Sequence, residues 1–218
     1  MLCRHLITAA FALAVPAVAS AQSFGVAARA GTLGFGGEAA YQISDNFAVR
    51  AGVGTYPFSI TGELTDGRYE ITPPSSLLNA GVDFYPGWLD FRIGAGMLMI
   101  GDETQFDAQY TGGTVVIDGQ EYTDEEAGTV RGELDHGAAA PYANIGLGRH
   151  TGGGIGIFAD FGAAFLGEQN VTLTATGPAA QNAEFQDRLD AEREDIETEV
   201  RKYVKVLPII SVGIRFGF

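Results

Sequence analysis

The sequence has a single cysteine, Cys3, and it lies within the first few residues of the chain. If this residue is removed with an N-terminal signal peptide, the mature chain has no cysteine. It then forms no disulfide and no thiolate metal site. Basic residues are also scarce, since 13 lysines and arginines stand against 27 aspartates and glutamates, for a formal net charge of −14. Because a nucleic-acid interface needs a basic face toward the phosphates, we expect no nucleic-acid partner.

Long apolar runs are missing as well. The apolar stretch from Leu6 to Ala19 is shorter than the roughly 20 residues that a membrane-spanning helix needs. It follows the basic Arg4 and ends at the small residues Ala19-Ser20-Ala21, which together are the features of a secretory signal peptide. We therefore expect residues 1–21 to be a cleaved signal peptide and residues 22–218 to form one exported domain.

Glycine and apolar side chains are abundant, with 31 glycines and 46% hydrophobic residues. In eight segments the apolar residues recur at every second position, which is the spacing of one face of a β-strand. These positions fall within residues 24–28, 35–43, 47–53, 78–84, 91–99, 141–147, 155–165 and 204–218. The spacing predicts eight strands.

The opposite face of each predicted strand consists mostly of glycine with one strongly polar residue. These polar residues are Arg29, Glu38, Arg50, Asp83, Arg92, Asn144, Asp160 and Arg215. A uniform apolar face backed by glycines and ions is typical of a barrel with lipid outside and a polar lumen. A closed barrel also satisfies every backbone polar group where no water is available. We therefore predict an all-β fold, an eight-stranded antiparallel up-and-down transmembrane β-barrel.

The connections between these strands differ in length. Those at residues 44–46, 86–88 and 149–154 are short, whereas those at 60–75, 101–135 and 168–202 are long. Short periplasmic turns and long extracellular loops are the rule in such barrels. Aromatic residues gather near the predicted short-turn end, where an interface girdle is expected: Phe24, Phe47, Phe84, Tyr85, Trp88, Phe91, Phe216 and Phe218.

Two elements are expected inside the long loops. The stretch from Ala183 to Lys202 has Phe185, Leu189, Ile196 and Val200 on one face of a helix. We expect this helix to pack over the barrel mouth or its own loops. Residues 115–119, Val-Val-Ile-Asp-Gly, predict a hairpin that projects above the membrane.

The end of the chain carries the most specific pattern. Apolar residues alternate up to a terminal phenylalanine at Ile210, Val212, Ile214, Phe216 and Phe218. This pattern resembles the C-terminal strand of Gram-negative outer-membrane proteins, which the barrel-assembly machinery recognises. With the signal peptide and eight strands, the chain resembles the small OmpA/OmpW-like β-barrel superfamily. The resemblance implies location in the cell outer membrane, with outer-membrane lipid, lipopolysaccharide and the assembly machinery as partners.

The eight polar residues of the glycine-rich face predict an ionic network inside the lumen. An eight-stranded barrel is only wide enough for side chains to fill it, and buried ions must pair. We interpret the network as a structural plug, so that the protein has a structural or surface-exposed role. The alternatives are a narrow channel for small or amphiphilic solutes and, third, a lipid-modifying enzyme of the outer membrane.

The second long loop is strongly acidic. Arg131 is the only basic residue there against ten acidic ones, Asp102, Glu103, Asp107, Asp118, Glu121, Asp124, Glu125, Glu126, Glu133 and Asp135. Such a loop is usually solvated and self-repelling. Carboxylate oxygens also suit Ca²⁺ or Mg²⁺, although the spacing matches no calcium loop.

Motifs for catalysis are absent from the sequence. Residues 154–159 match a dinucleotide fingerprint only by their letters, because they begin a predicted strand instead of a helix. His136 and His150 lie at opposite ends of the sixth predicted strand, so no catalytic triad can be assembled from them. We expect the protein not to be an enzyme and to take no cofactor.

The terminal strand generates a first prediction. Deleting Phe218, or replacing it with aspartate, should lower the amount of assembled barrel without altering export, because the last aromatic completes the assembly signal. Quantifying folded barrel in outer-membrane fractions, with signal-peptide processing as the export control, measures this. A normal level of folded barrel in both variants would contradict the assignment of this strand.

Overall fold

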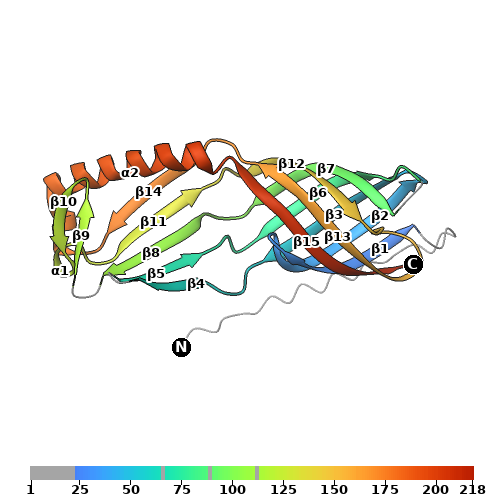
Figure 1. The fold of residues 1–218 in the computed structure, drawn as a ribbon, viewed down its shortest axis with the longest axis horizontal. Helices are drawn as coiled ribbons and strands as arrows, with labels where there is room; N and C mark the ends of the chain where they lie inside the picture. Colours follow the sequence, from blue (N-terminus) through green and yellow to red (C-terminus); the bar gives the residue numbers. More distant parts are fainter. Residues whose placement is uncertain (1–22, 65–66, 88–89, 111–112) are drawn as a thin grey trace, which may run out of the picture.

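The computed structural model describes residues 23–64, 67–87, 90–110 and 113–218, so the predicted signal peptide at 1–21 lies outside the described residues. Eight antiparallel strands close a barrel in the order β1-β15-β13-β12-β7-β6-β3-β2, which confirms the predicted fold class (Figure 1). Their bounds are β1 (Phe24–Gly31), β2 (Gly34–Ser44), β3 (Phe47–Thr55), β6 (Leu77–Phe84), β7 (Phe91–Ile100), β12 (Ala139–Leu147), β13 (Gly154–Phe165) and β15 (Val206–Gly217).

The barrel closes between its first and last strands. β1 pairs with β15 along its length, from Gly25 opposite Gly217 to Gly31 opposite Ser211. The backbone amide of Phe218 also donates to the carbonyl of Phe24 at 2.8 Å. Closure leaves the barrel with no free strand edge, which is the condition for crossing a membrane with strands.

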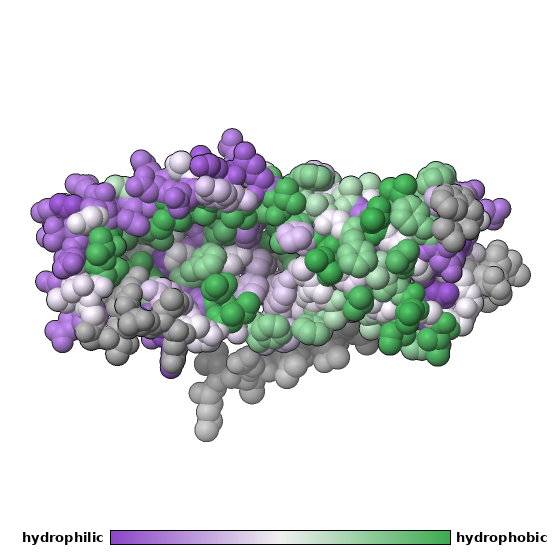
Figure 2. Space-filling view, in the orientation of Figure 1, coloured by the Kyte–Doolittle hydropathy of each residue, from purple (hydrophilic) through white to green (hydrophobic). Residues whose placement is uncertain are grey.

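The apolar residues of the barrel strands face outward. Tyr41, Leu147, Ile157 and Val212 are 54%, 58%, 77% and 59% exposed. Figure 2 shows a predominantly apolar surface over the barrel half of the molecule, whereas the half that carries α2 (Ala183–Tyr203) is largely hydrophilic. Such exposure would be costly in water and is favourable against lipid.

The long connections are not irregular loops. They fold into a five-stranded antiparallel sheet that extends the barrel at its long-loop end (Figure 1). Its order is β14 (Asn170–Ala175), β11 (Val130–Asp135), β8 (Thr104–Tyr110), β5 (Gly67–Thr72) and β4 (Ile60–Leu64). Each of these strands is short, and two of the four pairings, β5 with β8 and β11 with β14, join different connections, so sequence periodicity alone did not indicate the sheet.

The predicted hairpin and helix are both present. Strands β9 (Thr114–Ile117) and β10 (Gln120–Thr123) pair across Asp118 and Gly119, whose φ angles of 46° and 73° suit a two-residue hairpin turn. Two short helices, α1 (Asp124–Ala127) and the 3₁₀ turn η1 (Pro178–Gln181), were not expected. Within the described residues, no helix is both long and apolar enough to cross a membrane.

Local interactions explain where helix α2 begins and ends. The side chain of Asn182 accepts from the backbone amide of Glu184 at 3.0 Å, and Arg201 and Lys202 occupy the last turn, where positive charge is favourable. The amide of Val204 still bonds to Val200, at 2.8 Å. The last strand therefore begins at Val206, two residues later than the alternation predicted.

Closure of the barrel generates a second prediction. Unboiled protein in dodecyl sulfate should migrate differently from boiled protein, because every strand of the closed sheet has two partners and the barrel resists detergent until heated. Gel mobility of the mature chain before and after boiling tests this. Identical mobility, together with recovery in the soluble periplasmic fraction, would rule out a membrane barrel.

Candidate functional site

The structure places most of the predicted polar residues in one cluster inside the barrel. Arg29, Glu38, Arg50, Asp83, Arg92, Asn144 and Asp160 are all buried, with exposed fractions of 0–6%. We call this set, together with His150, the lumen network. Arg215 does not belong to it. Its guanidinium instead donates to the carbonyl of Gly152, in the short turn before β13, and to that of Gly154, the first residue of β13.

The Arg50 side chain is the centre of the lumen network. Its guanidinium lies 3.7 Å from Glu38 Oε2, 3.3 Å from Asp83 Oδ1 and 3.6 Å from Asp160 Oδ2. It also donates to Asn144 Oδ1 at 2.9 Å. The partners come from four strands, β2, β6, β12 and β13, so this one side chain connects much of the barrel wall.

A second guanidinium completes the pairing of Asp83. Arg92 Nε lies 3.7 Å from Asp83 Oδ2, and Arg92 Nη2 lies 2.7 Å from Asp160 Oδ1. Arg92 also donates to the backbone carbonyls of Leu147 and Gly148. Asp83, which is fully buried, thus lies between two arginines, and its charge is compensated from both sides.

His150 is a member of the network that sequence reasoning missed. Its Nδ1 lies 2.8 Å from Glu38 Oε1 and its Nε2 lies 3.7 Å from Asp160 Oδ2. The ring also contacts the ring of Phe158, with centroids 4.3 Å apart. We expected this residue at a strand end because it belongs to a short turn, but the turn folds back into the barrel.

The position of Tyr85 also differs from the prediction, because this residue too belongs to a short connection that folds inward. We expected it in the aromatic girdle, but it is fully buried, and its hydroxyl accepts from the backbone amide of His150 at 3.3 Å. The Arg149 guanidinium lies over its ring, 4.4 Å from the centroid. Two short connections therefore pack together at the short-turn end of the lumen. Trp88, from the same predicted girdle, lies outside the described residues.

Glycines on the inner face make room for the charged side chains. A Cβ atom at Gly94 would lie 2.5 Å from Asp83 Oδ1, and one at Gly146 would lie 2.5 Å from the central guanidinium carbon of Arg92. Real side chains do not approach so closely. Because glycines have no side chain, those of the predicted lumen face leave the space that the charged side chains occupy.

An apolar layer lies above the lumen network, toward the five-stranded sheet. Leu33, Leu77, Leu98, Ala140 and Ile209 are buried against one another, with exposed fractions of 0–4%. Tyr142 belongs to both layers, because it packs in this cluster while the Arg50 guanidinium lies 5.7 Å from its ring centroid. The lumen is therefore filled at two levels, first by ions and then by hydrocarbon.

The acidic second loop folds mostly into strands β8, β9, β10 and β11 and the short helix α1. Asp107 and Arg131 are neighbours on β8 and β11 and make two contacts of 2.6 and 3.0 Å, which raise the pKa of Arg131. Glu126 forms a capping box with Thr123, and these hydrogen bonds lower the pKa of Glu126. Among the described residues, no three acidic or histidine side chains are grouped to hold a metal ion.

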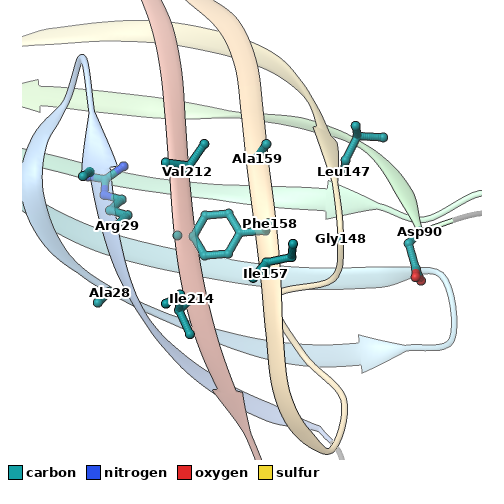
Figure 3. Close-up of a pocket in the computed structure, with 12 residues that line it drawn as sticks. Ala28, Arg29, Asp90, Leu147, Gly148, Ile157, Phe158, Ala159, Val212 and Ile214 are labelled. Atoms are coloured by element: carbon teal, nitrogen blue, oxygen red, sulfur yellow. The ribbon is translucent and has the colours of Figure 1, made fainter.

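A hollow of about 830 Å³ lies in the barrel wall, and its lining includes the buried inner-face residues Arg29 and Phe158 as well as outward-facing side chains. Figure 3 shows side chains from β1, β15, β13 and β12 around it, including Ala28, Val212, Ile157 and Leu147. The last three of these are more than half exposed, on the lipid-facing side of the strands. The hollow therefore includes part of the membrane-facing surface.

Comparison with protein-family models and with curated protein sequences finds no match. Solved structures do match. Acinetobacter baumannii CarO2 is 23% identical with a TM-score of 0.61, and the alignment covers 91% of this chain and 99% of that chain. Acinetobacter baumannii CarO is 20% identical with a TM-score of 0.57, covering 89% and 97%.

Both solved proteins are outer-membrane β-barrels, and at this level of identity the likeness shows a shared fold. The exposed apolar wall and the buried ions of the lumen agree with it, because only a barrel surrounded by lipid gains from that arrangement. The chain therefore has the closed eight-stranded fold of these outer-membrane β-barrels.

Proposed function

We propose that the protein is a closed outer-membrane barrel with a structural or surface-exposed role. The proposal rests on one observation, that the lumen is filled at two levels, by paired ions and by apolar side chains. Arg29, Arg50 and Arg92 balance the carboxylates of Glu38, Asp83 and Asp160, and the apolar layer of Leu33, Leu77 and Leu98 lies above them. A barrel filled in this way anchors the sheet at its extracellular end.

A narrow channel for small or amphiphilic solutes is the second candidate. It is favoured by the chemistry of the lumen network, because its arginines and carboxylates would line a polar path if the plug moved. The extended sheet could then receive the solute. A closed barrel should carry no ionic current, whereas a channel should carry one. Current measurements therefore distinguish the two functions.

We further propose that the protein is not an enzyme and takes no cofactor. The ionisable groups that could supply chemistry, His150, Glu38 and Asp160, are 1–6% exposed, and the two carboxylates lie 2.8 and 3.7 Å from the His150 ring. A finer placement in the OmpA/OmpW-like superfamily rests on the terminal residues Ile210 to Phe218. The expected partners are outer-membrane lipid, lipopolysaccharide and the barrel-assembly machinery, with no nucleic acid.

The pairing of Asp83 generates a third prediction. Asp83→Ala should destabilise the barrel by about 3–5 kcal/mol, because it leaves two buried guanidiniums short of a counter-charge. The matched control is Asp107→Ala, which removes the partner of the exposed Arg131 and should cost less than about 1 kcal/mol. Urea unfolding in lipid vesicles measures both. Equal costs would mean that the lumen network does not hold the barrel together.

Conductance provides the fourth prediction. The wild-type protein in planar bilayers should show no sustained open state, whereas Arg50→Ala should leak ions, because it removes the side chain that connects three carboxylates across the lumen. Arg131→Ala, in the extracellular sheet, is the matched control and should stay closed. The heat-modified gel mobility establishes that each variant is folded. A steady wild-type current unchanged by Arg50→Ala would favour the channel and refute the closed barrel.

A further inference from the structure

The five-stranded sheet outside the barrel has one apolar face and one polar face. The register brings Phe106 opposite Gly132 and Gly132 opposite Leu173, so these three share a face. The intervening positions Asp107, Arg131 and Thr174 are aligned in the same way on the other face. A sheet in water normally covers its apolar face completely.

Helix α2 covers that face incompletely. In its first half the apolar side chains are buried, because Phe185 and Leu189 pack with Val115 and Ile117 of the hairpin at exposed fractions of 1–7%. In its second half, Ile196 and Val200 face a groove of about 340 Å³ whose other wall is formed by β8, β11 and β14. Phe106, in that wall, is 38% exposed.

The groove has the size and lining of a ligand site. Protein interiors are close-packed and hold few voids larger than a water molecule, whereas ligand pockets measure roughly 300–1,000 Å³. The residues along the groove are almost all apolar, and they include Phe106, Val130, Leu134 and Leu173. Val130 and Leu173 also pack against the hairpin cluster, so the groove adjoins a filled apolar core and suits one apolar chain.

Gly132 forms the floor of the groove. A Cβ atom there would lie 3.3 Å from Leu173 Cδ2 and 3.8 Å from Phe106 Cβ, so a small side chain is nearly accommodated. A larger one would have to project into the open space between the sheet and α2. The depth of the groove thus depends on the absence of a side chain at this single position.

The charges around α2 favour a cationic head group. On the β14 flank of the helix, Arg201 donates to the carbonyl of Gln169 at 3.0 Å, and Arg193 pairs with Glu197 at 3.0 Å. The flank on the other side of Ile196 carries Asp195 and Glu199, by the spacing of a helix, together with Glu192, whose carboxylate accepts from the backbone amide of Asp118 at 2.9 Å. The accessible rim is therefore negative.

We propose that this groove binds the hydrocarbon chain of a single-chain amphiphile with a cationic head group. The proposal adds a ligand to the surface-exposed role proposed above and rests on that placement of the sheet. It does not depend on whether the lumen is closed, so the conductance measurements and the binding experiment can fail separately.

Photo-crosslinking tests the proposal on the full mature chain in nanodiscs. The probe is a dodecyltrimethylammonium analogue with a diazirine at the chain end, and labelled residues are mapped by peptide mass. Label should appear on β8, β11 and the second half of α2 as well as on the lipid-facing barrel strands, which provide an internal reference. Label confined to the barrel strands would overturn the proposal.

Gly132→Leu should reduce the groove label to background while the label on the barrel strands is unchanged. Gly62→Leu is the matched control, because Gly62 lies on the edge strand β4 and a Cβ there meets nothing within 4 Å. If Gly132→Leu does not fold by gel mobility, Ile196→Asp makes the same test from the helix side. Undiminished groove label in a folded Gly132→Leu or Ile196→Asp would refute the site.

The head group is tested with a dodecyl sulfate analogue that carries the same diazirine. Weaker groove labelling by the anionic probe, with equal labelling of the barrel strands, supports the assignment of a cationic head. Equal groove labelling by both probes would overturn that part of the proposal. Salt should reduce the difference between the probes, because the acidic rim is exposed and screened.

Discussion

The contacts of Arg50 organise the interior of this barrel. An eight-stranded barrel has room inside only for side chains, so a guanidinium there cannot keep a full hydration shell. Arg50 instead lies 3.3–3.7 Å from the carboxylates of Glu38, Asp83 and Asp160, which come from three different strands. Removing any one of these groups leaves a charge buried without compensation. The strands are thus tied together through their lumen faces as well as through their backbones.

Several other features follow from burying these ions. The inner face must be rich in glycine, because Cβ atoms at Gly94 and Gly146 would collide with Asp83 and Arg92. The outer face can then be uniformly apolar, as Ile157 at 77% exposure illustrates. Short turns contribute as well, since the turn that carries His150 folds inward and brings its ring nitrogen Nδ1 within 2.8 Å of the Glu38 carboxylate. The packing of the lumen and the lipid-facing wall are two consequences of one constraint.

The extracellular half of the molecule follows different rules. Its sheet extends beyond the barrel and buries its apolar face only in part, under α2 and the β9–β10 hairpin. Its ion pairs, such as Arg131 with Asp107, are exposed and contribute little to stability. A rigid, ion-filled barrel therefore carries a module whose surface is free to recognise a ligand. The groove beside Gly132 is where that module leaves apolar space unfilled.

The sequence alone determined the features that depend on local periodicity. Alternation assigned residues such as Arg50 and Asp83 to one face and Val49 and Val82 to the other, and a 3.6-residue repeat indicated the helix of α2. The terminal alternation up to Phe218 defined the last strand, although its start moved to Val206 because α2 extends to Tyr203. These features could be predicted because the polarity of each residue indicates which face of its strand or helix it occupies.

The tertiary structure decided what depends on residues far apart in the chain. It turned His150 and Tyr85 into the lumen, left Arg215 outside the lumen network, and paired five segments from three long connections into one sheet. The direction of a short turn and the partners of a short strand have no periodic signature. They are selected by the space left inside the barrel and by the apolar face that the assembled strands must cover, which exist only once the chain has folded.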